Sequence, residues 1–190
     1  KRRWRRCSRR DNSGRGRLLH QRRIDERPTE VATRETFGHW EGDLIQGAAG
    51  TGHLVTLVER KTRFALVGWT PTREAKDVTR AVIRLLSELP VHVRRSVTFD
   101  NGKEFAGHER IAKRLKLDIY FAYPYRSWER GSNENVNGLV RRLYPKRSSF
   151  AGVDAYQIWQ LRRFLNDRPR GCLDWKTPSE EMAAFLGFAP

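Results

Sequence analysis

Cysteine, methionine and long apolar runs are all scarce in this sequence. Its 190 residues include two cysteines, Cys7 and Cys172, and neither has a cysteine or histidine companion at the spacing of a zinc site. A disulfide-stabilised scaffold and a zinc finger are therefore excluded, and a reducing compartment is indicated. No apolar run approaches the roughly 18–20 residues of a membrane-spanning helix. The only methionine is Met182, so we expect the chain to be a fragment of a longer protein.

Acidic residues are outnumbered, with 22 Asp and Glu against 38 Lys and Arg, which gives a formal net charge of +16. Residues 1–27 hold twelve of the basic residues and three of the acidic ones, without the apolar periodicity of a helix. We expect a basic, disordered arm or linker there, followed by one domain over residues 28–190. Arginines bind DNA phosphates by releasing counterions. The arginines of the arm that we predict to contact DNA are Arg2, Arg3, Arg5, Arg6, Arg9 and Arg10.

Large aromatic side chains and apolar periodicity indicate one folded α/β domain. Hydrophobic residues make up 38% of the sequence and aromatic residues 11%, which is enough to build a core. The pattern predicts strands over residues 40–45, 53–59, 64–69, 96–99 and 118–122. It predicts helices over residues 73–89, 105–115, 132–143 and 154–166, and a last helix that begins at Thr177. The order predicts a five-stranded mixed sheet, three antiparallel strands followed by a βαβ unit, flanked by helices.

Three carboxylates occupy positions from which they can meet. Asp43 lies within the first predicted strand, Asp100 ends the fourth, and Glu134 lies in the first turn of a helix. If the first and fourth strands are neighbours, the two aspartates approach each other, and a helix across that edge can add the glutamate. Close carboxylates repel one another unless a divalent cation lies between them. Oxygen ligands favour two Mg²⁺ or Mn²⁺ ions, which suit phosphodiester chemistry on a nucleic acid.

Spacing alone leaves other carboxylates open as members of such a site. Glu41 shares a strand face with Asp43, Glu104 follows Asp100 by four residues, and Glu129 lies in the loop before the helix. The pattern by itself goes no further than a basic α/β protein in which a metal site is one interpretation.

Several long motifs are more specific than this spacing. They are GHWEGDLI at 38–45, TLVERKTRF at 56–64, FDNGKEF at 99–105 and PYRSWERGSNENVNGLVRRLYPK at 124–146. Together with NDRPRGCLDWKTPSE at 166–180, they closely resemble the catalytic core of bacterial insertion-sequence transposases. The match is to the family named after insertion sequence thirty, kin to retroviral integrases. The resemblance covers most of the chain, from about Ile24 to Glu181.

The resemblance implies an RNase H-like fold with a triad of catalytic, metal-binding carboxylates, Asp43, Asp100 and Glu134. The last two are separated by 33 residues, the spacing of the family. It implies two Mg²⁺ or Mn²⁺ ions, cleavage at transposon ends and transfer of the exposed 3′-hydroxyl strand into target DNA. The implied partners are transposon-end and target DNA and further copies of the chain on that DNA, with no membrane and no nucleotide cofactor. The implied location is the bacterial cytoplasm, at the nucleoid.

The residues that we predict to contact DNA beside the triad come from two sources. The family's motif places Asn137, Arg141 and Lys146 along and after the helix that carries the glutamate. Arg130 and Trp128 lie in the preceding loop, where aromatic residues interleaved with arginines suit contacts with unstacked bases.

The loop of residues 123–129 departs from the family's pattern. The sequence FAYPYRSWERG stands where the family has a form like FADPYSPWQRG. The three carboxylates are retained, so the departure concerns recognition of the DNA ends and mobility of the loop. Two other functions stay open at this point: an RNase H-like nuclease that cuts without joining, and an inactive DNA-binding remnant of a decayed element.

Overall fold

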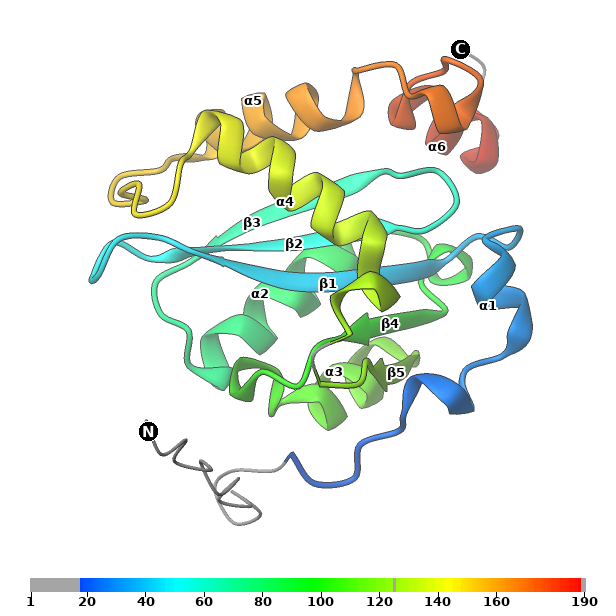
Figure 1. The fold of residues 1–190 in the computed structure, drawn as a ribbon, viewed down its shortest axis with the longest axis horizontal. Helices are drawn as coiled ribbons and strands as arrows, with labels where there is room; N and C mark the ends of the chain where they lie inside the picture. Colours follow the sequence, from blue (N-terminus) through cyan, green and yellow to red (C-terminus); the bar gives the residue numbers. More distant parts are fainter. Residues whose placement is uncertain (1–17, 125, 189–190) are drawn as a thin grey trace, which may run out of the picture.

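A computed structural model describes residues 18–124 and 126–188 and contains one five-stranded sheet (Figure 1). The strands are β1 (His39–Gln46), β2 (His53–Glu59), β3 (Ala65–Thr70), β4 (Ser96–Phe99) and β5 (Asp118–Phe121). Their order across the sheet is β3-β2-β1-β4-β5. The first three strands pair antiparallel, whereas β4 runs parallel to both β1 and β5. The mixed sheet expected from the sequence is confirmed.

Helices cover both faces of this sheet. They are α1 (Thr29–Thr33), α2 (Ala75–Ser87), α3 (His108–Leu115), α4 (Gly131–Leu143), α5 (Ala155–Asn166) and α6 (Pro178–Leu186). Short 3₁₀ turns lie at Ile24–Glu26, Val91–Val93, Lys103–Phe105, Ser127–Arg130 and Gly171–Leu173. Helices α2 and α3 pack on one face, and α4 and α5 pack on the other (Figure 1). No helix within the described ranges is long and apolar enough to cross a membrane.

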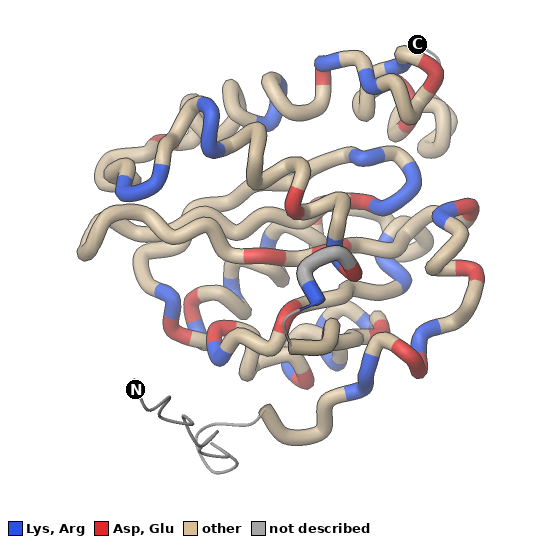
Figure 2. The backbone as a smooth tube through the Cα atoms, in the orientation of Figure 1, with Lys and Arg blue, Asp and Glu red and all other residues tan. Residues whose placement is uncertain are grey.

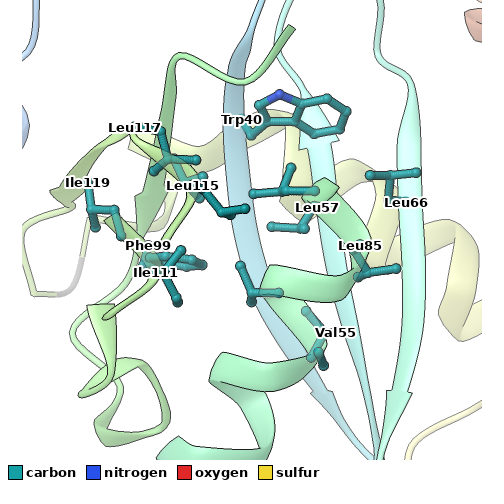
Figure 3. Close-up of a cluster of buried hydrophobic side chains, with 14 of the residues drawn as sticks. Trp40, Val55, Leu57, Leu66, Leu85, Phe99, Ile111, Leu115, Leu117 and Ile119 are labelled. Atoms are coloured by element: carbon teal, nitrogen blue, oxygen red, sulfur yellow. The ribbon is translucent and has the colours of Figure 1, made fainter. Parts of the chain in front are cut away.

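The two-sided covering explains why the strands are apolar at successive positions. In β2, Val55 and Leu57 pack into a cluster with α2, whereas Leu54 and Val58 pack into a second cluster with α4 and α5. A strand buried on both faces reads as a continuous apolar run, because neighbouring side chains point to opposite faces. Figure 3 shows the first cluster, in which Trp40 is completely buried.

Close packing between β1 and β4 brings the ends of two motifs together. Gly42 in β1 lies against the ring of Phe99 at the end of β4, and a Cβ atom on Gly42 would overlap that ring. Each of these residues directly precedes an aspartate, Asp43 and Asp100. The glycine therefore allows the close approach that places the two aspartates on neighbouring strands.

The structure describes residues 18–27 of the expected arm. Residues 18–27 run beside β5, where Arg23 forms a β-bridge with Phe121 and Arg22 pairs with Asp118 at 2.6 Å. These contacts form because the edge strand β5 offers backbone groups that the passing chain can pair with. Residues 1–17 of the expected arm lie outside the described residues.

Candidate functional site

Asp43 and Asp100 face one positively charged group. Strands β1 and β4 are parallel neighbours, as expected, and Asp100 follows β4 directly. The guanidinium of Arg130 lies between the two carboxylates, with Nη1 3.5 Å from Asp43 Oδ2 and Nη2 3.5 Å from Asp100 Oδ2. Only 12% of the Arg130 side chain is exposed, against 23% for Asp43 and 36% for Asp100. Both aspartates therefore converge on a single cationic position in a partly buried site.

The pKa of the Asp43 carboxyl depends on the charges and hydrogen bonds around it. Burial raises the pKa of the Asp43 carboxyl above its ordinary value, and the negative charge of Asp100 raises it further. The guanidinium of Arg130 and hydrogen bonds from the Leu44 N–H and the Asn137 amide act in the opposite direction. A cation between the two aspartates is thus favoured by the site itself.

Helix α4 presents one face to β1. Asn137 donates from Nδ2 to Asp43 Oδ2 at 2.7 Å, and Arg141 donates from Nη2 to the Gln46 carbonyl at 2.9 Å. Glu134 lies one turn before Asn137, so it begins the same face, and it is exposed. The structure therefore brings two of the three expected carboxylates to one cationic group, whereas Glu134 is exposed on α4.

Oxygen donors at the two aspartates fit a hard divalent cation, and the guanidinium of Arg130 acts as a positively charged stand-in there. Within residues 18–124 and 126–188, no group of three Asp, Glu, His or Cys side chains is close enough together to hold a metal ion. The fit to a metal thus rests on Asp43 and Asp100.

The other carboxylates that spacing left open have different roles. Glu41 is completely buried, forms an ion pair with Arg60 and accepts a hydrogen bond from the Asn133 N–H at 2.9 Å, which fixes the start of α4. Glu129 accepts from the Tyr123 N–H at 2.9 Å.

Glu104 is a carboxylate on which the charges of both aspartates act. The pKa of its carboxyl is raised first by burial and then by the negative charges of Asp100 and Asp43. The charges of the two aspartates therefore act on Glu104, but within the described residues the three carboxylates do not lie close enough together to bind one metal ion.

The side chains predicted to contact DNA are placed differently from one another. Asn137 and Arg141 make the contacts with β1 described above, and Arg141 also donates to the Pro145 carbonyl at 3.3 Å. Lys146 is exposed beyond the end of α4. Trp128 belongs to the 3₁₀ turn Ser127–Arg130, and its side chain lies outside the described atoms. The arginines of residues 1–10 also lie outside the described residues.

Sequence reasoning missed the position of Arg130 between the two aspartates. The sequence offers one weak signal, which is that Arg130 precedes Glu134 by one helical turn. Lysine and arginine positions are spread along the backbone over several helices and loops rather than gathered on one element (Figure 2).

Comparisons with known proteins identify the family of this chain. The model of the integrase core domain matches residues 33–127. The chain is 40% identical over 175 residues to the transposase for insertion sequence element IS4351 of Bacteroides fragilis, covering 92% of this chain and 53% of that protein. It is 35% identical over 176 residues to transposase InsI for insertion sequence element IS30A of Escherichia coli (strain K12), covering 93% and 46%. The chain thus spans about half the length of these curated relatives.

Proposed function

The chain belongs to the integrase core domain family, whose fold is RNase H-like, and from this premise we propose that it is the catalytic core of a DNA transposase. The core cuts a phosphodiester at the end of a mobile element and joins the freed strand to target DNA. The observation that carries the proposal is the convergence of Asp43 and Asp100 on one cationic position beside α4. The printed names of the relatives, which are transposases, support it.

The reaction proceeds in two displacements at phosphorus. A water oxygen attacks the phosphate at the element's end, and the 3′-oxygen leaves with the bonding electrons and takes a proton, which gives a 3′-hydroxyl. That hydroxyl then attacks a target phosphate, and one phosphodiester forms as another breaks. Because the number of phosphodiester bonds is unchanged in the second step, joining requires no ATP.

The residues that hold the two Mg²⁺ or Mn²⁺ ions in this proposal are Asp43, Asp100 and Glu134. Bound there, such ions activate the attacking oxygen and stabilise the charge on the reacting phosphate. Support for the two aspartates comes from the guanidinium that already lies between them. Support for Glu134 comes from its place on the face of α4 that carries Asn137.

Neighbouring side chains orient this site and balance its charge. The Asn137 amide holds Asp43 in one orientation through its 2.7 Å hydrogen bond. Arg130 balances the charges of both aspartates in the metal-free chain and can turn toward a DNA phosphate once those charges are balanced otherwise. Lys146, exposed past the end of α4, adds a point charge for the same backbone.

Replacing Asp100 with Asn tests the proposal. Nicking and strand transfer on a supercoiled plasmid carrying element ends are measured with Mg²⁺ or Mn²⁺. We expect the Asp100→Asn variant to lose both products, because a neutral amide no longer balances a divalent ion. Glu109→Gln is the matched control, since Glu109 is exposed on α3 across the sheet and should leave activity unchanged. Undiminished nicking by Asp100→Asn contradicts the assignment, and nicking without any joined product supports a nuclease instead.

A metal-binding measurement keeps the test decisive if the chain alone does not cut. The free Mn²⁺ signal in electron paramagnetic resonance falls when the ion is bound. We expect the chain to bind Mn²⁺ and the Asp43→Asn/Asp100→Asn variant to bind far less, with Glu109→Gln as before. Equal Mn²⁺ binding by all three proteins would contradict the proposed metal site. DNA binding without metal binding or cutting would support an inactive remnant.

A further inference from the structure

A basic cavity of about 290 Å³ opens at the start of α4 and has no role in the proposed reaction so far. Three arginines from separate segments line it, together with the first residues of α4 and a cysteine. They are Arg34, Arg63, Arg170, Gly131, Ser132 and Cys172. Arg34 ends α1, Arg63 lies in the turn between β2 and β3, and Arg170 belongs to the C-terminal motif singled out in the sequence. We call this cavity the arginine pocket.

Positive charge dominates the lining of the arginine pocket. No acidic residue lines the cavity, and none of its three arginines forms an ion pair with an acidic residue of the described chain. The pKa of the Arg34 guanidinium is lowered by burial and then by the positive charges of Arg63 and Arg60, against a smaller opposing effect of the Glu41 carboxylate. Clustered cations that depress one another in this way are stabilised by an anion.

The hydrogen-bond donors of these arginines are also only partly used. Arg63 donates from Nη1 to Ser132 Oγ at 2.7 Å, and Arg170 donates from Nη2 to the Leu165 carbonyl at 2.8 Å. Arg170 Nε is buried without a hydrogen-bond partner in the described structure. A buried, unpaired donor costs free energy unless a ligand accepts from it. The guanidinium groups that line the pocket therefore keep donors that no residue of the described chain accepts from.

The start of α4 adds to the attraction for an anion. The N-cap residue Arg130 makes no side-chain cap on this thirteen-residue helix, and Glu41 accepts only from the Asn133 N–H in its first turn. Gly131 and Ser132 line the pocket at the positive end of the helix. Arginines are suited to phosphate oxygens because their planar donors can bind two oxygens at once.

We propose that the arginine pocket binds a backbone phosphate of the DNA on which the core acts. The pocket is lined by Ser132 and Asn135, which belong to the same turn of α4 as Glu134 but to a different face of the helix, so it is a second contact point on the helix that carries the glutamate. The inference rests on the proposed function in taking DNA as the ligand. It assigns the C-terminal motif, through Arg170, a part in holding that DNA.

The first test measures DNA binding by fluorescence anisotropy, using a labelled duplex oligonucleotide over a range of NaCl concentrations. We expect Arg34→Gln, Arg63→Gln and Arg170→Gln each to weaken binding and to lower the slope of log Kd against log salt concentration, because each removes part of the charge that neutralises the bound phosphate. Arg114→Gln is the control, since Arg114 is an exposed arginine on α3 across the sheet. Arg34 makes no side-chain hydrogen bond to another described residue, so its variant is least liable to unfold. If the pocket variants match the control, the proposal is wrong.

The second test reads occupancy of the pocket directly through Cys172, an exposed free thiol. All proteins carry Cys7→Ser, so Cys172 is the only cysteine that reacts with N-ethylmaleimide. We expect saturating duplex DNA to slow the labelling several-fold, and Arg34→Gln, but not Arg114→Gln, to remove that protection. A labelling rate that DNA does not change overturns the proposal. Because neither test involves cutting, a failed nicking assay leaves this inference standing, and failure here leaves the metal site standing.

Discussion

Two carboxylates on β1 have different roles, because one faces the proposed metal site and the other holds a helix in place. Glu41 and Asp43 lie on the same face of β1, yet Glu41 is completely buried against Arg60 and the start of α4, while Asp43 is open to the site. The partner of each carboxylate decides its role. Glu41 therefore acts as a positioning residue, because it holds the helix that carries Glu134 and Asn137.

Replacing Glu41 with alanine should destabilise the fold strongly. The substitution leaves the Arg60 charge buried without its partner, and breaking such a pair costs about 3–5 kcal/mol. Urea unfolding measures the change in the free energy of unfolding. Glu74→Ala is the control, because Glu74 pairs with Lys76 on the open surface and its loss should change stability little. Equal losses in the two variants contradict this role for Glu41.

Whole elements were the part of the fold that local patterns predicted best. The bounds of β2 and β4 agree with the predicted residues, and the predicted helix 73–89 is α2, Ala75–Ser87. The spacing of apolar residues depends only on residues that are close together in the chain. It can therefore predict each strand or helix without knowledge of the rest of the fold. The predicted helix 105–115 instead divides into a 3₁₀ turn at Lys103–Phe105 and α3, which begins at His108.

Two glycines in neighbouring elements should respond to the same substitution in opposite ways. Gly42→Ala should destabilise the protein by about 1–3 kcal/mol, because its Cβ would overlap Phe99 and force β1 from β4. Gly138→Ala should stabilise it by about 0.5–1 kcal/mol, because nothing lies near a Cβ there and alanine favours the interior of α4. Urea unfolding compares both with the unmodified chain. A neutral or stabilising Gly42→Ala would show that β1 and β4 are not packed closely at Gly42.

The whole molecule places many positive charges around buried groups, and His39 shows the effect on stability. His39 is buried in β1, with its Nδ1 2.7 Å from Ser96 Oγ. Its pKa is lowered to about 4 by burial first and then by the charges of Arg95, Arg27 and Arg60, against an opposing effect of Asp118. The folded protein therefore keeps this imidazole neutral at a pH where the unfolded chain protonates it.

The stability that depends on His39 should be fully present above pH 6.5, the ordinary value, and be lost as the pH falls toward 4. Below pH 6.5 the unfolded chain binds a proton that the folded protein does not, and the loss amounts to about 3 kcal/mol by pH 4. Urea unfolding between pH 7 and pH 4 measures it. His39→Asn should remove this part of the pH dependence, and an identical pH dependence in both proteins would refute the role of the histidine.

The sequence by itself determined the order of the strands and helices, and the motifs that placed Asp43, Asp100 and Glu134 as candidates. Only the tertiary structure placed Arg130 between the two aspartates and buried Glu41 against Arg60. Only the structure gathered Arg34, Arg63 and Arg170 into one pocket. The reason is physical: periodicity and motifs are set by residues close together in the chain. The charge and burial of a side chain depend on partners that are distant in sequence, and the packing of helices on the sheet selects those partners.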